Sequence, residues 1–249
     1  MSDLSGKSVL VTGGGTGLGA ALARAYAEAG ADVWIAGRRE GPLQEVAASH
    51  DAIRCVTADV TDEASVAAMY QATGPCDIVI ANAGASASAP FPKTDLATWQ
   101  QMIDVNLTGV FLTLREGARK MKKRDWGRLI AVASTAGLKG YPYVAAYTAA
   151  KHGVVGMVKA TALEMAKTGV TVNALCPGFL DTEMTERSVA NIMEKTGMSA
   201  ADARGQLEKM SPQRRLTQPS EVVAAAMWLS GPGSEGITGQ AISISGGEA

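Results

Sequence analysis

Three polar side chains have the types and the spacing to transfer a proton. Tyr147 and Lys151 lie four residues apart in a segment predicted to be helical, so they share one helix face about one turn apart. A tyrosine phenol has a pKa near 10, and lowering that pKa to about 7 requires roughly 4 kcal/mol. A lysine ammonium about 5 Å away supplies roughly 3 kcal/mol at an effective dielectric constant of about 20. We therefore expect Tyr147 to act as a general acid or base whose pKa is lowered by Lys151, with Ser134 nearby.

Taken singly, these residues also have ordinary structural explanations. A tyrosine and a lysine at this spacing are common on amphipathic helices, and a serine after a strand is typical of turns. The assignment therefore depends on the other motifs of the chain.

A glycine-rich turn, Thr12-Gly13-Gly14-Gly15-Thr16-Gly17-Leu18-Gly19, follows the first predicted strand and opens the first predicted helix. Glycines permit a tight turn and a close approach of the backbone to a pyrophosphate, while the helix N-terminus offers free N–H groups. A glycine-rich stretch alone is weak evidence, since it is also compatible with a flexible surface loop. The strand–turn–helix context favours a dinucleotide site.

The end of the second predicted strand bears on the choice of dinucleotide. An NAD site usually carries an acid there, but this strand ends Gly37-Arg38-Arg39, and the nearby Asp32 stands at the opposite end of the strand. Arg38 can pair with a 2′-phosphate through a bidentate contact. The pattern favours NADP and leaves NAD open, because both arginines could instead be solvated residues at a helix start.

Short apolar runs alternate with helical segments from one end of the chain to the other. The predicted strands are residues 7–12, 31–36, 53–57, 77–81, 128–133, 170–176 and 241–244. Continuous β-branched runs of this kind suit a parallel sheet that is buried on both faces. The predicted helices are residues 17–29, 43–49, 62–72, 96–123, 145–167 and 220–229, with Thr61 as an N-cap candidate.

This alternation predicts an α/β fold: a doubly wound, mostly parallel seven-stranded sheet of the Rossmann type, with helices on both faces. We expect residues 1–249 to form one dinucleotide-binding and catalytic domain. Ser134, the glycine-rich turn, Asn82 and Pro177-Gly178 all follow predicted strands. They should therefore meet at the carboxyl edge of the sheet, where open parallel sheets bind ligands.

Composition and charge narrow the range of partners. The formal net charge is −1, so no global field favours nucleic acid or an anionic membrane. The three cysteines, Cys55, Cys76 and Cys176, are widely spaced and indicate reduced thiols rather than a disulfide framework or a metal site. No apolar leader and no run of 18 apolar residues is found, which makes a cytoplasmic location our expectation.

Several motifs together resemble the short-chain dehydrogenase/reductase (SDR) family, in its short single-domain branch, over essentially the whole chain. The motifs are the glycine-rich turn, Asp59-Val60, Asn82-Ala83-Gly84, Asn106, Ser134 with Tyr147 and Lys151, and Pro177-Gly178 with Thr182. Two positions depart from the family pattern. Ala81 replaces an asparagine, which could alter the packing of the fourth strand, and Ser245 stands in a Ser-Gly-Gly that is Asp-Gly-Gly in relatives, which could alter a subunit contact.

The resemblance implies a role for each matching residue. Tyr147 would exchange the proton, Ser134 would bind the substrate oxygen, Lys151 would also bind the nicotinamide ribose, and Asn106 would hold a water that relays protons to Lys151. The dinucleotide would be bound by Gly13, Gly15, Thr16, Gly17, Leu18, Gly19, Arg38, Asp59, Val60, Asn82, Ala83, Gly84, Tyr147, Lys151, Pro177, Gly178 and Thr182.

By the same resemblance, the chain is expected to transfer a hydride between NADP or NAD and a carbonyl or secondary alcohol. The nearest activities are 3-oxoacyl thioester reductases, acting on acyl carrier protein or CoA, and 3-hydroxyacyl dehydrogenases. The alternatives are another ketone or alcohol (cyclic, sugar, steroid or quinone), a catalytically silent dinucleotide-binding protein, and an epimerase or dehydratase of the longer branch, for which 249 residues leave little room. A homotetramer is also expected.

Two further segments are ambiguous. Residues 181–218 form an insertion that would cap the substrate, and its apolar residues could line a pocket or pack between helices: Met184, Val189, Ile192, Met193, Leu207 and Met210. Residues 86–91 and 138–143, which include Tyr141 and Tyr143, are expected to form the opposite wall. A basic cluster within residues 119–128 could dock an acidic partner or simply be solvated.

Overall fold

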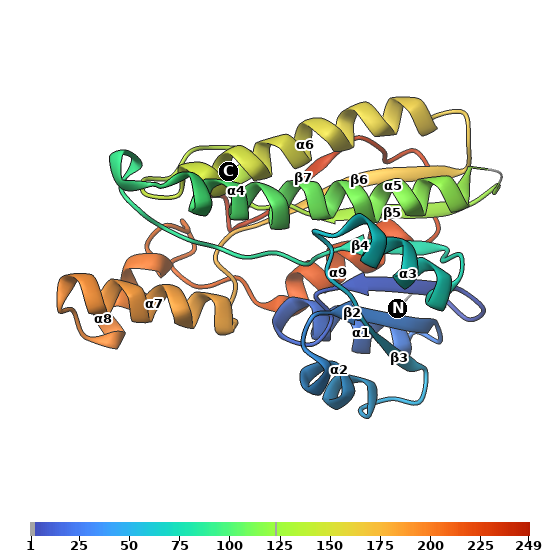
Figure 1. The fold of residues 1–249 in the computed structure, drawn as a ribbon, viewed down its shortest axis with the longest axis horizontal. Coiled ribbons are helices and arrows are strands. Elements are labelled where there is room, and N and C mark those ends of the chain that lie inside the picture. Colours follow the sequence, from blue (N-terminus) through green and yellow to red (C-terminus); the bar gives the residue numbers. More distant parts are fainter. Residues whose placement is uncertain (1–2, 123) are drawn as a thin grey trace.

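The computed structural model describes residues 3–122 and 124–249. Seven strands form one parallel sheet in the order β3-β2-β1-β4-β5-β6-β7, which confirms the doubly wound fold (Figure 1). The strands are β1 (Ser8–Thr12), β2 (Asp32–Gly37), β3 (Ile53–Thr57), β4 (Ile78–Ala81), β5 (Gly127–Val132), β6 (Val170–Pro177) and β7 (Ala241–Ile244).

Helices cover both faces of the sheet because strand side chains alternate between two cores. On β1, Leu10 contributes to the core beneath α3 (Glu63–Thr73), α5 (Gly109–Met121) and α6 (Ala145–Met165). Its neighbours Val9 and Val11 face the other core, beneath α1 (Gly17–Glu28), α2 (Glu40–Ala47) and α9 (Pro219–Ser230). The continuous apolar runs of the strands follow from this burial on both faces.

The segment expected to be one long helix over residues 96–123 is divided in three. A π-helical turn, η2 (Asp104–Thr108), separates α4 (Leu96–Ile103) from α5, and residue 123 lies outside the described residues. Asn106 stands in this turn and donates hydrogen bonds from Nδ2 to the carbonyls of Ala85 and Met102, at 2.9 and 3.0 Å. The turn therefore aims a buried amide at the loop after β4, and π-helical turns are frequent at functional sites.

The N-cap of α3 is a different residue from the one predicted. Asp62, rather than Thr61, is the N-cap, and its carboxylate accepts a hydrogen bond from the Ala64 amide at 2.9 Å. The Thr61 hydroxyl instead donates to the Asp59 carboxylate at 2.8 Å. Thr61 therefore braces the Asp59-Val60 motif and does not start the helix.

Two helices, α7 (Glu183–Thr196) and α8 (Ala200–Glu208), extend beyond the sheet where β6 ends (Figure 1). They hold a small core of their own, formed by Val189, Ala203, Leu207 and Leu216 with Phe179 and Ile192 packed against it. Among the apolar residues of this segment, Val189, Ile192 and Leu207 thus pack between helices, whereas Met184, Met193 and Met210 are exposed. Within the described residues, no helix is long and apolar enough to cross a membrane.

Candidate active site

The glycine-rich turn leaves no space for side chains where it meets its neighbours. Gly13 has a φ of +67°, and a Cβ there would lie 2.9 Å from the Cα of Ala83. A Cβ on Gly19 would lie 2.1 Å from the carbonyl oxygen of Gly13, so only glycine lets α1 begin so close to the turn. The backbone amides at the start of α1 are thereby brought to the carboxyl edge of the sheet. The turn fits the pyrophosphate of a dinucleotide.

The end of β4 is fastened to this turn. The Asn82 side chain donates to the carbonyl oxygens of Thr12 and Gly13, at 2.9 and 3.3 Å. In return, the Thr12 hydroxyl accepts from the backbone amides of Asn82 and Ala83, both at 3.1 Å. Asn82 and Ala83 therefore hold the shape of the turn, and Thr12 is a bracing residue whose role the motif alone did not reveal.

Gly84, Asn106 and Lys151 meet behind that edge. A Cβ on Gly84 would lie 3.0 Å from Oδ1 of Asn106 and 3.8 Å from Nζ of Lys151. The same Oδ1 accepts a hydrogen bond from the Ala85 amide at 3.2 Å. The glycine therefore keeps open the space between a buried amide and a buried ammonium, which the π-helical turn and α6 bring together.

Lys151 is almost completely buried, with 3% of its surface exposed. Its Nζ donates to the Val132 carbonyl at 2.8 Å and lies 5.5 Å from the centroid of the Tyr147 ring. Burial lowers the pKa of Lys151 from 10.5 to about 8, because desolvation disfavours the ammonium. The amine therefore titrates much closer to neutrality than an exposed lysine.

The pKa of the Tyr147 phenol is shifted in the direction opposite to the one predicted from the Tyr–Lys spacing. Burial raises its pKa above the ordinary value of 10.0, while a hydrogen bond with the Ser134 side chain acts to lower it. Desolvation is the larger of these two effects, so the pKa of Tyr147 is raised on balance. The lowering expected from the Tyr–Lys spacing is therefore not a property of this chain by itself.

Cys176 is a neighbour that the sequence did not single out. It lies fully buried near the end of β6, and burial raises the pKa of its thiol to about 11, whereas the backbone of Ser134 and the charge of Lys151 act to lower it. Directly after it, Pro177-Gly178 leads to Thr182, the N-cap of α7. The Thr182 side chain lies 3.5 Å from a Cβ built on Gly17, so this motif reaches back to the glycine-rich turn.

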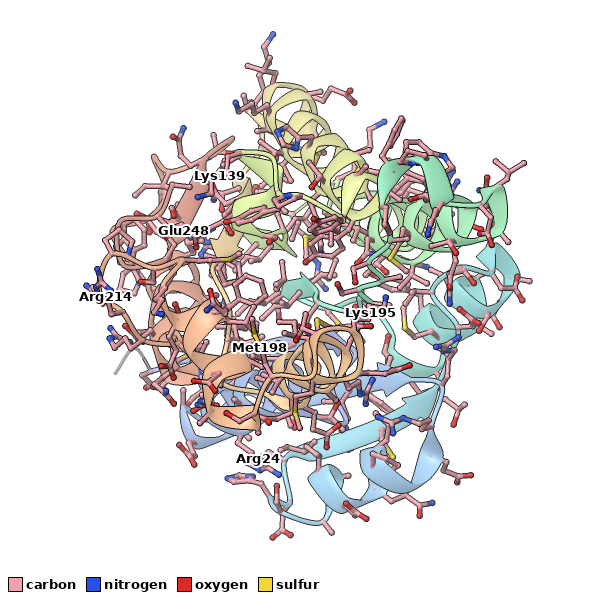
Figure 2. The ribbon with its side chains drawn as sticks, turned by 90° about the vertical axis from the view of Figure 1, so that its left-hand side faces the viewer. Arg24, Lys139, Lys195, Met198, Arg214 and Glu248 are labelled. Atoms are coloured by element: carbon pink, nitrogen blue, oxygen red, sulfur yellow. The ribbon has the colours of Figure 1, made fainter. Side chains whose placement is uncertain are left out.

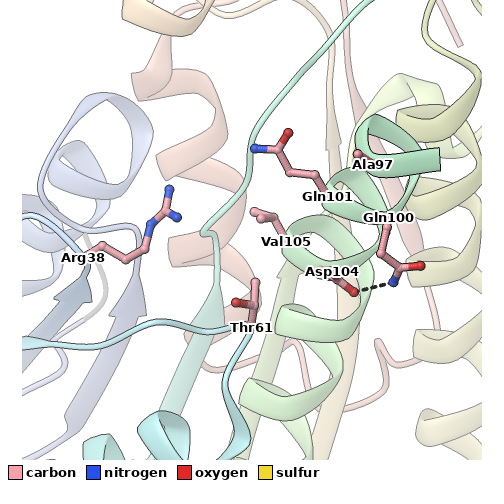
Figure 3. Close-up of a pocket in the computed structure, with 7 residues that line it drawn as sticks. All are labelled: Arg38, Thr61, Ala97, Gln100, Gln101, Asp104 and Val105. Carbon is pink, nitrogen blue, oxygen red and sulfur yellow. Dashed lines mark hydrogen bonds between the residues drawn. The ribbon is translucent and has the colours of Figure 1, made fainter. Parts of the chain in front are cut away.

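A cleft of about 380 Å³ lies at the end of β2 (Figure 3). Arg38, which is exposed, stands on one side, and Gln101 and Val105 stand on the other. Hydrogen bonds from Thr61 lower the pKa of Asp59, and the charge of Arg38 contributes to the same effect. Arg38 and the Asp59-Val60 motif, which were predicted to bind the coenzyme, therefore lie in one region beside the glycine-rich turn. Val60 is buried in this region.

Three arginines of the basic cluster within residues 119–128 have structural partners. Arg119 pairs with Glu116 and Arg124 pairs with Asp77. Arg128 is buried and donates from Nε to the Leu229 carbonyl at 3.0 Å. Lys120 and Lys122 are exposed, and residue 123 lies outside the described residues, so the structure assigns a structural role to the arginines only.

Comparison with known proteins gives one consistent result. A family model described as short chain dehydrogenase matches residues 7–192. A putative ketoacyl reductase of Streptomyces coelicolor is 35% identical over 99% of this chain and 98% of its own length. A D-beta-hydroxybutyrate dehydrogenase of Cupriavidus necator is 36% identical over 98% of each chain. The crystal structure of a variant of actinorhodin polyketide ketoreductase with NADPH superposes with a TM-score of 0.92 at 34% identity, covering 100% of this chain and 99% of that one.

Proposed function

Since this chain belongs to the short-chain dehydrogenase family and is therefore an oxidoreductase of ketones and alcohols, we propose that it reduces a 3-oxoacyl thioester with NADPH or oxidises the corresponding 3-hydroxyacyl thioester. The names of its relatives support this substrate class. In β-hydroxybutyrate the reacting oxygen stands on the carbon β to the carboxyl group, and a 3-oxoacyl thioester carries its keto oxygen at the same position relative to the thioester carbonyl. The substrate class includes thioesters of CoA and of acyl carrier protein, and the assay below uses the CoA form.

The observation that carries the proposal is the convergence of Ser134, Tyr147 and Lys151 at the carboxyl edge of the sheet. The Ser134 side chain acts to lower the pKa of the Tyr147 phenol, and the Lys151 amine lies 5.5 Å from the centroid of the Tyr147 ring. In our proposal Tyr147 gives its proton to the carbonyl oxygen of the substrate, and the Ser134 hydroxyl donates a hydrogen bond to the same oxygen. Lys151 and Asn106 then return a proton to Tyr147 from the buried side.

The nicotinamide, when bound, supplies the hydride, and its oxidised ring adds a positive charge beside Tyr147. Burial raises the pKa of Tyr147 above 10.0 and lowers the pKa of Lys151 from 10.5 to about 8, so the Lys151 ammonium becomes a stronger acid than the Tyr147 phenol. The return of a proton from Lys151 to the Tyr147 phenolate is therefore favourable. The chain's own residues thus prepare a proton path before any coenzyme binds.

For the coenzyme we propose NADP(H) in preference to NAD(H), bound by the glycine-rich turn, Arg38, the Asp59-Val60 and Asn82-Ala83-Gly84 motifs, and the Pro177-Gly178 to Thr182 segment. Arg38 stands exposed at the rim of the cleft at the end of β2 and can reach a 2′-phosphate. The solved neighbour with NADPH supports the same choice.

A panel assay tests the proposal. The purified protein is incubated with NADPH or NADH and acetoacetyl-CoA, a cyclic ketone, a sugar, a steroid ketone or a quinone, and coenzyme oxidation is followed by absorbance. We expect the thioester to give the highest kcat/KM, with NADPH preferred, and we expect no turnover by the Tyr147→Phe variant. Preference for another ketone would refute the substrate class. Coenzyme binding without turnover of any compound would instead favour the silent dinucleotide-binding protein.

We also propose a homotetramer in the cytoplasm. Large apolar side chains on α4, α5 and α6 are exposed, namely Leu96, Phe111 and Leu163, and would be covered by subunit contacts. The thiols of Cys55, Cys76 and Cys176 are free, as expected in a reducing compartment. Light scattering coupled to size-exclusion chromatography tests the assembly, and a monomeric mass would refute it.

A further inference from the structure

A buried carboxylate lies outside the motifs discussed so far. Only 3% of the Glu248 side chain is exposed, although this residue follows the last strand and belongs to no helix or strand. Its Oε1 accepts a hydrogen bond from the Tyr141 hydroxyl at 2.6 Å and lies 3.2 Å from the Nζ of Lys139. Figure 2 shows Lys139 and Glu248 beside each other. A carboxylate is rarely removed from water in this way unless its partners compensate for the lost hydration.

These contacts continue to the turn that carries Ser134. The Tyr141 oxygen also lies 2.7 Å from the Thr135 hydroxyl, and Thr135 is buried directly after Ser134. The Tyr141 hydroxyl donates to the Glu248 carboxylate and also lies within donating distance of the Thr135 hydroxyl, so this one phenol is hydrogen-bonded to both groups. Tyr141 therefore connects the Ser134 turn to Glu248.

The same carboxylate touches the segment after β6. A Cβ on Gly178 would lie 3.3 Å from Oε2 of Glu248, so this glycine leaves space for the carboxylate. The backbone amide of Glu248 donates to the Ser245 hydroxyl at 3.2 Å, which fixes the chain that presents it. Glu248 thus stands between two segments of the candidate site, the Ser134 turn and the Pro177-Gly178 motif.

Residues 138–143 continue this arrangement along the rim of the site. Tyr143 has a φ of +69°, a left-handed conformation that costs free energy for a residue other than glycine. Its carbonyl accepts a hydrogen bond from the Ala89 amide at 2.8 Å, and the neighbouring Ser88 hydroxyl accepts from Asn191 of α7 at 3.1 Å. The two segments expected to wall the substrate are therefore hydrogen-bonded to each other and to the capping helix, while Glu248 anchors residues 138–143 from the opposite end.

We propose that Glu248 is a positioning residue of the active site, whose carboxylate fixes the substrate wall formed by residues 138–143 and, through Tyr141 and Thr135, the turn that carries Ser134. The role in turnover rests on the proposed function, whereas the fixation of the wall can be measured without turnover. The Glu248 carboxylate borders Gly178 of the coenzyme segment, but its hydrogen bond and ion pair go to Tyr141 and Lys139 of the substrate wall, so its loss should affect the ketone more than the coenzyme.

The test compares Glu248→Ala with Glu248→Gln, Tyr141→Phe and the control Glu28→Gln, which removes an exposed carboxylate at the end of α1. Amide hydrogen exchange is measured at Leu138 and Lys139, whose N–H groups donate to the Thr135 carbonyl, and at Ala89. For Glu248→Ala we expect exchange at these amides to be about tenfold faster, with exchange in the sheet strands unchanged. We expect Glu248→Gln, which keeps an acceptor for Tyr141, to lie between wild type and Glu248→Ala.

Steady-state kinetics supply the second measurement. We expect Glu248→Ala to lower kcat/KM for the ketone about tenfold and to leave the Kd of NADPH within about twofold of wild type. Adding Tyr141→Phe to Glu248→Ala should cause little further loss, because both substitutions break the same connection. The control should match wild type in both measurements.

The outcomes separate the two proposals. Wild-type exchange at residues 138, 139 and 89 in Glu248→Ala would refute the positioning role, as would faster exchange across the whole sheet, which would indicate only a loss of global stability. Faster exchange confined to the rim but unchanged ketone kinetics would also overturn it. A wild-type protein that turns over no ketone or alcohol would refute the proposed function, while the exchange measurements would still decide whether Glu248 holds the wall.

Discussion

Replacing Lys151 with methionine separates two consequences of burying its ammonium. The pKa of Lys151 falls from 10.5 to about 8 on folding, chiefly because desolvation penalises the charged form. At about 1.4 kcal/mol for each tenfold change in proton affinity, this drop means that the folded chain pays about 3 kcal/mol at pH 7 to keep the ammonium protonated. Methionine has a similar length without the charge, so that cost disappears. This gain in stability is partly offset by about 1–2 kcal/mol, because the Val132 carbonyl has no hydrogen-bond donor in the variant.

We therefore expect Lys151→Met to be more stable than wild type by about 1–2 kcal/mol at pH 7, and to lose at least about 100-fold in kcat/KM. The direction in which stability changes with pH follows from the number of protons that the folded and unfolded chains bind. Between about pH 8 and 10.5 the unfolded chain binds more protons at this lysine than the folded chain, so the stability of the wild type rises with pH in that window. The stability difference should consequently change by about 2–3 kcal/mol between pH 7 and pH 10, so that the variant becomes less stable than wild type at pH 10.

Urea unfolding of both proteins, free of coenzyme, at pH 7 and pH 10 measures these differences. Lys159→Met is the control, because Lys159 is exposed on the same helix two turns further on. The control should show no such dependence of its stability difference on pH. If Lys151→Met is less stable than wild type at pH 7, or its stability difference does not change with pH, the ammonium is not desolvated and the argument fails.

Three other substitutions test the remaining parts of the site. Tyr147→Phe should lower kcat by about 100-fold or more while leaving the Kd of NADPH unchanged in a fluorescence titration; substantial turnover would exclude Tyr147 as the proton donor. Arg38→Asp should shift the ratio of kcat/KM values from NADPH towards NADH by about 10–100-fold, since it exchanges a charge-assisted contact for repulsion, and an unchanged ratio would mean that Arg38 does not contact the 2′-phosphate. Gly19→Ala places a Cβ 2.1 Å from the Gly13 carbonyl oxygen, so thermal unfolding should show a loss of about 1–3 kcal/mol and titration a weaker affinity for the coenzyme; wild-type values in both would contradict the close approach.

The fold could be predicted from the sequence because its strands are buried on both faces. Continuous apolar runs of this kind have few alternative structures, and β4, β5 and β6 are buried at every position. The less buried edge strands β3 and β7 also begin and end where they were predicted to. Asp62 replaced Thr61 as the cap of α3 because Thr61 has a better partner in Asp59, which lies earlier in the same turn. The residue types alone could not decide between two neighbouring residues that are both common at N-cap positions.

The π-helical turn at Asn106 was not predictable from periodicity. Apolar residues continue through the segment at helical spacing, so the pattern indicates one uninterrupted helix. What divides it is a set of hydrogen bonds between Asn106 and the loop at Ala85, residues that lie 21 positions apart. The one local signal is an asparagine in the interior of an apolar helix, where its amide competes with the backbone for hydrogen bonds.

The positions at which local rules fail are also the positions that build the site. A lysine is buried, a tyrosine takes a left-handed conformation at 143, and a helix adopts a π-helical turn at Asn106. Each of these features lowers stability taken alone, and each lies at the carboxyl edge of the sheet rather than at its amino edge. The buried ammonium is stabilised by the Val132 carbonyl and the π-helical turn by Ala85 and Met102, both of which come from the packed framework. The packed strands, helices and loops around this edge therefore supply the free energy that lets it hold groups in states that solvent would not favour, and this is why stability and activity are expected to change in opposite directions at residue 151.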